Sequence, residues 1–389
     1  MKNNVNFNRA RPCTGCGACA AICPTSAIKM IQNKKGFYIP YIDESLCIEC
    51  GKCKSVCYSH IDKFFNSENI QSKFGFLLKT ESLYQSASGG VGFYLSQILF
   101  KEGYTIIGCA YNYESNTSEH IAVKNEKDLE ALRGSKYFQS NSSIACKLIR
   151  NSLPNTKFAI FGTPCQIYGF KLLVDALKKD INSFVFIEIF CHGVTSPYVW
   201  QKYLDYMNKN NDQIEHISFR SKKYGWHLSC NEIQFKNRTI ITKRVGDPFF
   251  EVYYSKKMFN EPCFACLARK NLGIADIRIG DFWGQRFQND SSGVSCILSM
   301  SEKGTRLIQK IDSKDFAIDD ANLEEILKSQ SYQQTYERYI ESENALFDSL
   351  LSKNSFRQII KILRSNLSVS EKVKKNLYIF LSNIKHKYH

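Results

Sequence analysis

Long hydrophobic runs are missing from this sequence, which limits what the chain can be. Eighteen consecutive apolar residues occur nowhere, so no segment has the length and apolarity of a membrane-spanning helix. The first eight residues, MKNNVNFN, lack the apolar core of a secretory signal. Disulfide bonds belong to oxidising compartments. We therefore expect the 16 cysteines to be thiols or metal ligands in a reducing, cytoplasmic environment.

Acidic residues are also in the minority. The 389 residues include 52 Lys or Arg against 37 Asp or Glu, a formal net charge of +15. The imbalance is concentrated in residues 352–389, which hold nine Lys or Arg and one acid, Glu371. Such an excess suits nucleic acid, an anionic membrane surface or an acidic protein partner, and composition does not choose among them.

Cysteine is abundant near the N-terminus. Two runs, at residues 13–23 and 47–57, share the spacing C-x2-C-x2-C-x3-C. This spacing holds cubane clusters in bacterial-type ferredoxins, where the fourth cysteine of each run binds the neighbouring cluster. We therefore predict two [4Fe-4S] clusters. Their ligands are Cys13, Cys16, Cys19 and Cys57 for one cluster, and Cys47, Cys50, Cys53 and Cys23 for the other.

The surroundings of the two runs favour clusters over zinc, because zinc sites usually combine two C-x2-C pairs. Residues 27–30 and 36–40 predict a short β-hairpin between the runs. The ferredoxin pattern is interrupted at one place. Proline follows Cys23, but Tyr58 stands where a second proline is usual.

The main body predicts an α/β sheet, because apolar strands alternate with helical segments after a polar linker at residues 66–73. A Ser-Gly-Gly turn at 88–90 runs into a helical pattern, and free N–H groups at a helix start suit a phosphate. An ordinary helix cap is the alternative. Ligands of such sheets bind at the carboxyl ends of strands, where Cys165 and Cys191 fall.

Beyond residue 200 the pattern changes. Residues 217–226 and 232–243 predict antiparallel strands, and the chain from Leu323 onward predicts helices with a lysine-rich end. The predicted fold class is α+β: a two-cluster ferredoxin domain, an α/β flavin-binding body with an antiparallel β insertion, and a helical basic tail. The predicted boundaries are 1–65, 74–200, 201–320 and 321–389.

Eight cysteines lie outside the N-terminal block, in two kinds of context. Cys109, Cys146, Cys230 and Cys296 lie within apolar runs typical of a core. The other four lie in loops rich in Gly, Pro or His, and two of them are spaced C-x2-C. They are Cys165, Cys191, Cys263 and Cys266. From spacing alone, a third cubane and a zinc site are both open.

Six motifs occur in a fixed order along the body. They are Ser-Gly-Gly-Val-Gly at 88–92, Arg-Gly-Ser-Lys-Tyr at 133–137, Gly-Thr-Pro-Cys-Gln at 162–166, Cys-His-Gly at 191–193, Cys-x2-Cys at 263–266 and Asp-Ile-Arg-Ile-Gly-Asp-Phe-Trp-Gly at 276–284. With these motifs, residues 10–310 resemble the coenzyme F420 hydrogenase/dehydrogenase beta-subunit family, in its form with an N-terminal two-cluster ferredoxin domain.

This resemblance implies an oxidoreductase that holds FAD beside a [4Fe-4S] cluster. It assigns the third cluster to Cys165, Cys191, Cys263 and Cys266. It places flavin contacts at Ser88, Gly89, Gly90, Lys136, Tyr137, Thr163, Gln166, Gly280 and Asp281. A solvated surface lysine is the alternative for Lys136. The arginine expected before Ser86 is absent.

The resulting hypothesis is an electron bridge. Clusters carry single electrons, and FAD pairs them for a two-electron acceptor, or the reverse. Candidate proton donors are His192 and His227, with structural hydrogen bonding as the alternative. We expect as partners a one-electron carrier such as ferredoxin or a redox partner subunit, and a small-molecule acceptor of unknown identity.

Two other hypotheses compete with this bridge. One is an electron-transfer subunit with no substrate of its own. The other is a basic nucleic-acid or membrane-surface protein with structural clusters. We expect no nucleic acid, and peripheral membrane contact stays open for the basic tail, where apolar residues recur at helical spacing. They are Phe356, Ile359, Ile360, Leu363, Val373, Leu377, Phe380 and Leu381.

Overall fold

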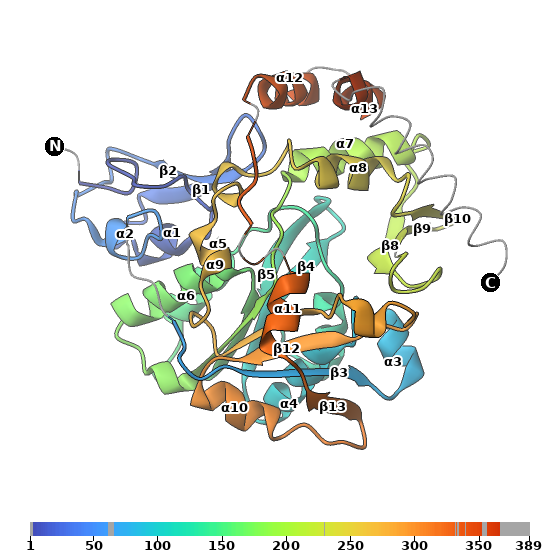
Figure 1. The fold of residues 1–389 in the computed structure, drawn as a ribbon. Helices are drawn as coiled ribbons and strands as arrows, with labels where there is room; N and C mark the ends of the chain where they lie inside the picture. The colour runs from blue at the N-terminus through green and yellow to red at the C-terminus, as the bar shows by residue number, and fades with distance from the viewer. Residues whose placement is uncertain are drawn as a thin grey trace.

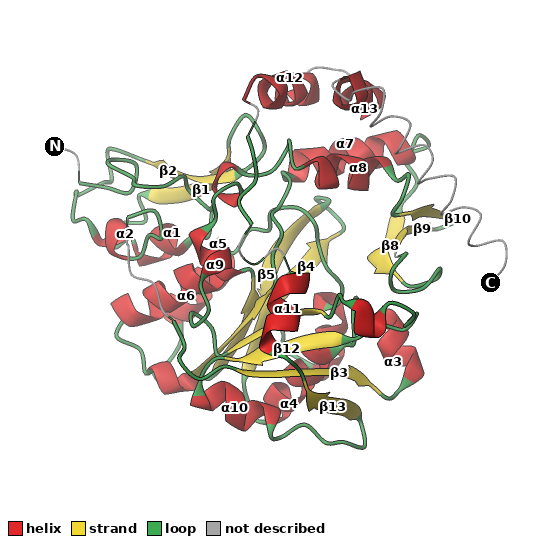
Figure 2. Ribbon diagram, in the orientation of Figure 1, coloured by secondary structure: helices red, strands yellow, loops and turns green. Residues whose placement is uncertain are grey.

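A central eight-stranded sheet organises the molecule, and helices cover it on both sides (Figures 1 and 2). The computed structural model of the chain describes residues 3–60, 66–228, 230–330, 332, 334–338, 340–351 and 356–365. The strand order is β13-β3-β12-β11-β7-β6-β4-β5. Strands β4, β6, β7 and β11 are mutually parallel, and the outer pairs are antiparallel. The strands are β3 Gln71–Leu77, β4 Thr105–Asn112, β5 Thr117–Ala122, β6 Phe158–Gly162, β7 Phe184–Ile189, β11 Ile277–Asp281, β12 Ser295–Ser299 and β13 Phe316–Asp320.

The two faces of the sheet have separate cores, because side chains alternate along each strand. In β6, Phe158 and Ile160 face one core, which helices α5 and α6 cover. Ala159 faces the other, which α4, η1 and α10 cover. These helices are α4 Val91–Lys101, η1 Glu126–Leu132, α5 Ser143–Asn151, α6 Pro164–Ala176 and α10 Glu302–Ile308. The short α11 Leu323–Ser329 adds Ile326 to the first core, and the short α3 Thr80–Gln85 adds Leu83 to the second. The predicted mixed α/β architecture of the body is confirmed.

The predicted linker at residues 66–73 is wrong in its second half. Residues 71–73 begin β3, which pairs with β12 on one side and β13 on the other. The polar residues at its start give no strand pattern in the sequence. The strand is stabilised by hydrogen bonds to two neighbouring strands that are distant in sequence. Strands from both sides of residue 200 therefore share one sheet, since β7 pairs with β11.

The N-terminal domain packs directly on the body, beside α5, α6 and α9 (Figure 1). It contains the predicted hairpin and two short helices. Ala18 and Val56 of this domain belong to the same buried cluster as Ile149 and Phe170 of the body. The elements are α1 Ala18–Ile22, β1 Ile28–Gln32, β2 Tyr38–Ile42, α2 Lys52–Ser55 and, in the body, α9 Leu267–Lys270.

A third core surrounds Trp200 and joins the antiparallel insertion to the start of the tail. The predicted antiparallel strands are confirmed in the order β10-β9-β8. The elements are α7 Pro197–Met207, β8 Ile214–Ser221, β9 Cys230–Phe235, β10 Arg238–Lys243, α8 Pro248–Ser255, α12 Ile340–Leu351 and α13 Phe356–Ser365. The apolar stripe of α13 is buried in this core, so the chain's own body covers it.

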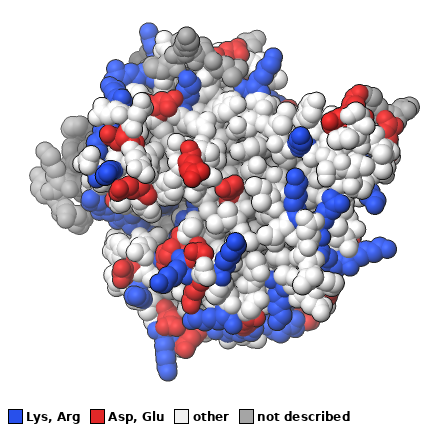
Figure 3. Space-filling view, turned by 180° about the vertical axis from the view of Figure 1, so that it is seen from behind, with Lys and Arg blue, Asp and Glu red and all other residues white. Residues whose placement is uncertain are grey.

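The rest of the predicted stripe, at Val373, Leu377, Phe380 and Leu381, lies outside the described residues. Across the described ranges, no helix is long and apolar enough to cross a membrane. Figure 3 shows Lys and Arg intermixed with Asp and Glu on the face seen from behind, around a broad uncharged area. On this face the positive charge is therefore not gathered into one basic surface.

Candidate functional site

Cysteines from both N-terminal runs lie close to one another. Burial raises the pKa of Cys19, and the nearby thiols of Cys16, Cys13, Cys57 and Cys53 add to the rise. Burial likewise raises the pKa of Cys16, and the thiols of Cys57 and Cys13 add to that rise. One run therefore receives its fourth cysteine from the other, as in a two-cluster ferredoxin.

The second N-terminal set is the more exposed. Burial raises the pKa of Cys53, with contributions from Cys50 and Cys23, so these three cysteines are neighbours. Cys47 is half-buried and Cys50 is exposed. Cys23 and Cys53 are buried, so Cys47 and Cys50 form the outward-facing side of this set.

The four loop cysteines of the body also come together. Burial raises the pKa of Cys165 strongly, and Cys266, Cys191 and Cys263 add to the shift. Burial likewise raises the pKa of Cys191 to about 11, with Cys266 adding to the shift. Cys165 and Cys191 follow β6 and β7, which are adjacent parallel strands. The sheet topology thus delivers two cysteines to one edge, where Cys263 and Cys266 meet them.

The donor chemistry of this body set suits a metal centre, since four thiols form it. Across the described residues, no group of three or more Cys, His, Asp or Glu side chains is arranged as the ligands of a single metal ion. In a cubane each cysteine binds a different iron, so the four cysteine sulfur atoms surround a whole cluster and lie farther apart than the ligands of one ion.

A cavity of about 1240 Å³ opens beside these cysteines, at the carboxyl ends of β6, β7 and β11. Single small-molecule sites span roughly 300–1,000 Å³. The cavity therefore has room for more than one small molecule. The predicted residues in its wall are Ser88, Gly90, Lys136, Tyr137, Thr163, Gln166, Gly280, Asp281, His192 and His227, together with Cys165, Cys191, Cys263 and Cys266.

The Ser-Gly-Gly turn forms one end of the cavity and leads into α4. Gly90 precedes the helix with φ 86°, a left-handed conformation that glycine adopts without strain. Ser88 Oγ donates to Val294 O at 2.8 Å. Gly89 lies behind the cavity wall, where a Cβ would meet Gly75 O at 2.2 Å. The turn is therefore built into the sheet and leaves its helix start facing the cavity.

An arginine from a distant segment reaches the position before this turn, where the sequence has none. The Arg133 guanidinium donates to Ser86 Oγ at 2.9 Å and to Gln85 Oε1 at 3.1 Å. It lies over the Phe93 ring at 4.0 Å. Sequence reasoning quoted Arg133 within a motif but did not assign it to this place.

Lys136 is not a solvated surface lysine, so that alternative is wrong. Its Nζ donates to Arg133 O at 2.8 Å and Cys109 O at 2.9 Å, with three further carbonyls within 3.4 Å. Burial lowers its pKa. The ammonium therefore holds the loop that carries Tyr137, whose ring packs edge-on against Tyr253 at 4.9 Å.

Thr163 and Gln166 support the helix that carries Cys165. Their side chains form a capping box at the start of α6. Gln166 Nε2 also donates to Ser140 Oγ at 2.9 Å. The side chains of Thr163 and Gln166 are thus bonded mainly to other protein groups, and these bonds hold the first turn of α6 in place.

Asp281 joins three elements at the end of β11. Arg220 Nη1 donates to its Oδ2 at 2.5 Å, and Trp226 Nε1 donates to its Oδ1 at 2.7 Å. The Arg220 guanidinium also lies over the Trp283 ring at 5.3 Å. Arg220 lines the cavity, and its buried Nε and Nη2 have no hydrogen-bond partner among the residues that the structure describes. Sequence reasoning missed this residue, which has no motif of its own.

The two candidate proton donors differ in setting. Burial lowers the pKa of His192 to about 4, which favours a neutral ring. His227 lies against Trp226 and Trp283, with ring centroids 4.7 and 5.6 Å away, and its Nε2 faces Phe287 O at 2.9 Å. Both line the cavity. Their roles as donors stay predictions.

Lys222 ties the antiparallel insertion to the turn. Its Nζ donates to Leu83 O at 2.7 Å and Ser88 O at 2.6 Å, and only 3% of the residue is exposed. Burial lowers its pKa to about 7. A neutral amine has two N–H groups, one for each carbonyl.

This lysine predicts a pH dependence of stability. The unfolded lysine keeps its proton up to about pH 10.4, so above pH 7 the unfolded state binds more protons than the folded state. The unfolding free energy of the wild type, minus that of Lys222→Met, should rise with pH by up to about 1.4 kcal/mol per unit. Anaerobic urea unfolding at pH 7, 8 and 9 measures this difference. The exposed Lys101→Met is the control, and a flat difference for Lys222→Met contradicts the prediction.

The fold and the cysteine sets define the class of this chain, an iron–sulfur electron-transfer protein. Residues 12–61 match the 4Fe-4S dicluster domain. Residues 155–322 match the family described as the C terminus of the beta subunit of coenzyme F420 hydrogenase/dehydrogenase. Over these ranges the chain matches those two families, which confirms the resemblance predicted from the motifs.

Two curated proteins are similar in sequence. The F subunit of F(420)H(2) dehydrogenase from Methanosarcina mazei is 26% identical over 293 residues, which cover 71% of this chain and 78% of that protein. An iron-sulfur subunit of CoB--CoM heterodisulfide reductase from Methanocaldococcus jannaschii is 38% identical over 58 residues, 12% of this chain and only 9% of that protein. A chain of the F420-reducing [NiFe] hydrogenase complex from Methanosarcina barkeri, solved as a xenon derivative, is 14% identical with a TM-score of 0.48, over 78% of this chain and 92% of that one.

Proposed function

We propose that this chain is an iron–sulfur flavoprotein oxidoreductase with three [4Fe-4S] clusters and one FAD. Two clusters belong to the N-terminal domain, and the body cysteines hold the third. The observation that carries the proposal is the cavity at the sheet edge, whose wall contains both the body cysteines and the turn at residues 88–90. A place for an electron carrier and a place for a phosphate-bearing cofactor are thus contiguous.

The body cysteines fit a cluster by their chemistry. Burial raises the pKa of the Cys263 and Cys266 thiols, so in this setting the thiolates need a bound cation. Arg269 contributes a nearby positive charge, and its Nη2 donates to Cys263 O at 2.7 Å. Zinc would accept the same ligands but carries no electrons. A centre between the N-terminal clusters and the proposed FAD must carry electrons, which favours a cluster of iron and sulfide over zinc.

The cavity fits FAD at the turn. Helix α4 starts there, and helix starts favour phosphates. Arg220 and Arg133 line the cavity and have buried nitrogen atoms without hydrogen-bond partners, which an anionic group would satisfy. Bound there, FAD supplies the conversion between single-electron transfer and paired-electron or hydride chemistry. The protein's part is to hold it with the turn and the two guanidinium groups, and to offer His227 as a proton donor.

A second candidate is an electron-transfer subunit without a substrate of its own. Exposed apolar side chains around Cys50 favour it, because 48% of Leu46 and 63% of Ile48 are exposed. Apolar surface beside an outward-facing cluster suits contact with a redox partner protein. Reduction of small-molecule acceptors by the isolated chain, with a chemical reductant as electron source, separates the two candidates.

Iron, acid-labile sulfide and flavin contents of anaerobically purified protein test the proposal. We expect about twelve irons and one FAD in the wild type, and about eight irons with weakened flavin binding in Cys165→Ala/Cys191→Ala. The control is Cys230→Ala, a buried cysteine of β9 outside all three sets, which should keep the wild-type contents.

Two results would contradict the proposal in different ways. About eight irons and no flavin in the wild type would remove the flavoenzyme and leave a ferredoxin domain on a binding body. An unchanged iron content in the double variant would place any third cluster elsewhere.

A further inference from the structure

Tyr58 departs from the ferredoxin pattern at a place where that departure has structural consequences. It follows Cys57, a predicted ligand of the Cys13/Cys16/Cys19/Cys57 cluster, here called the inner cluster. Only 3% of Tyr58 is exposed. Proline at this position would supply a rigid turn but no ring and no hydroxyl. The contacts made by the ring and the hydroxyl therefore depend on tyrosine at this position.

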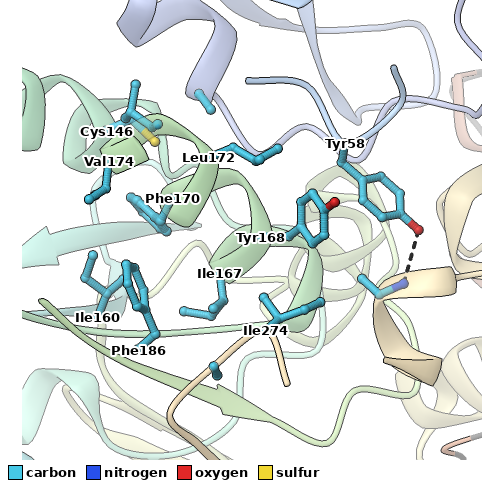
Figure 4. Packing of buried hydrophobic residues seen from close by; sticks show 14 of the residues in the cluster. Tyr58, Cys146, Ile160, Ile167, Tyr168, Phe170, Leu172, Val174, Phe186 and Ile274 are labelled. Carbon is cyan, nitrogen blue, oxygen red and sulfur yellow. Dashed lines mark hydrogen bonds between the residues drawn. The ribbon is translucent and has the colours of Figure 1, made fainter. Parts of the chain in front are cut away.

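Tyr58 contacts the two segments that carry body cysteines, in addition to Arg11 of its own domain, whose guanidinium lies over its ring at 5.2 Å. Ala268 N–H donates to its hydroxyl at 3.1 Å, two residues after Cys266 (Figure 4). Its ring packs edge-on against Tyr168, with centroids 5.3 Å apart, three residues after Cys165.

A second close contact brings the inner cysteine set against the same helix. Gly169 lies inside α6, where glycine costs helix stability. A Cβ at this position would meet Cys16 Sγ at 2.6 Å. The absence of a side chain therefore lets a predicted cluster ligand rest on the helix that begins with Cys165.

Hydrogen bonds to the backbone of Cys16 hold this arrangement. Ser142 Oγ donates to Cys16 O at 2.8 Å, just before α5. The Cys47/Cys50/Cys53/Cys23 set, here called the outer set, is also bonded to the body, since Arg150 Nη1 donates to Cys23 O at 2.8 Å, but its Cys50 is exposed. The inner set differs in that a thiol sulfur, Cys16 Sγ, lies against helix α6.

We propose that Tyr58 and Gly169 are positioning residues that make the Cys13/Cys16/Cys19/Cys57 cluster the one that exchanges electrons with the body cluster. This inference rests on the proposed third cluster. In one transfer the inner cluster is oxidised by one electron and the body cluster is reduced by one, with no proton moved. The outer cluster would then exchange electrons with the one-electron carrier. Electrons from that carrier would therefore pass first to the outer cluster, then to the inner cluster and then to the body cluster.

The test compares Tyr58→Pro and Gly169→Ala with wild type in the full-length protein. Tyr58→Pro restores the ferredoxin pattern and removes ring and hydroxyl, and Gly169→Ala favours the helix but displaces Cys16. Tyr41→Phe is the control, an exposed tyrosine of the same domain. Iron content, the magnetic interaction between reduced clusters in the EPR spectrum, and the rate of electron transfer from the N-terminal clusters to the body cluster are measured.

We expect both variants to keep their irons, with weaker magnetic interaction and severalfold slower transfer, since both quantities fall as the separation of the two clusters grows. Tyr41→Phe should match the wild type. Wild-type interaction and rate in a fully loaded variant would overturn the inference, and Gly169→Ala decides if Tyr58→Pro loses iron. Absence of the body cluster from the wild type would instead contradict the proposed function.

Discussion

Replacing Arg278 with methionine is expected to lower the free energy of unfolding by about 3–5 kcal/mol, the cost of leaving a buried charge without its partner. Arg278 lies in β11 opposite Glu188 in β7, and their side chains are 1% and 0% exposed. Arg278 Nε donates to Glu188 Oε1 at 2.6 Å. Two further bonds reach Arg269 O at 3.1 Å and Asn271 O at 2.5 Å.

The position of this pair gives it an effect beyond the strand. Residues 269–271 end α9, the helix that follows Cys266. Arg278 therefore holds the segment that carries a body cysteine, and the variant should also lose iron from the body cluster. Anaerobic urea unfolding, with iron content on the same samples, measures both effects.

A surface arginine provides the matched control. Arg306 pairs with Glu302 at 3.4 Å on α10, and its side chain is 64% exposed. Arg306→Met should cost no more than about 0.5 kcal/mol. Arg278→Met/Glu188→Leu should be more stable than Arg278→Met, because the lone buried carboxylate is removed too. Equal losses in the single and double variants would show that the pair's charge is not the cause.

The sequence predicted best what is local along the chain. The predicted ferredoxin ligands lie within two short runs, and their spacing alone predicted the dicluster domain that residues 12–61 match. Strand ends predicted the meeting of Cys165 and Cys191, because parallel neighbours share an edge. Each of the six motifs contributes residues to the cavity wall.

What could not be predicted depends on partners far apart in sequence. Arg220 meets Asp281 across 61 residues, and Arg133 reaches Ser86 across 47. The sequence around Arg220 or Arg133 contains no pattern that predicts which residue it will contact. The start of β3 was read as linker because Gln71, Ser72 and Lys73 are polar, although a central strand can carry polar residues where both its neighbours hydrogen-bond it.

Gly89→Ala is the second change with a large expected effect, because the added methyl group has nowhere to go. Its Cβ would meet Gly75 O at 2.2 Å and Ser295 N at 2.6 Å. Both are backbone atoms of paired strands, β3 and β12, and cannot rotate away. Gly89 O also accepts from Leu77 N at 2.8 Å. The turn must therefore shift as a unit, at a cost of about 1–3 kcal/mol.

Because that turn leads into the helix start proposed to hold the cofactor, Gly89→Ala should lose FAD while keeping the irons of all clusters. Gly162→Ala is the matched control, since it lies in the same cavity wall and its Cβ would meet no atom closer than 3.4 Å. Flavin content and urea unfolding of the two variants are compared with wild type. Loss of stability with full flavin would show that the turn serves the sheet alone, whereas loss of flavin with iron retained would tie the turn to cofactor binding.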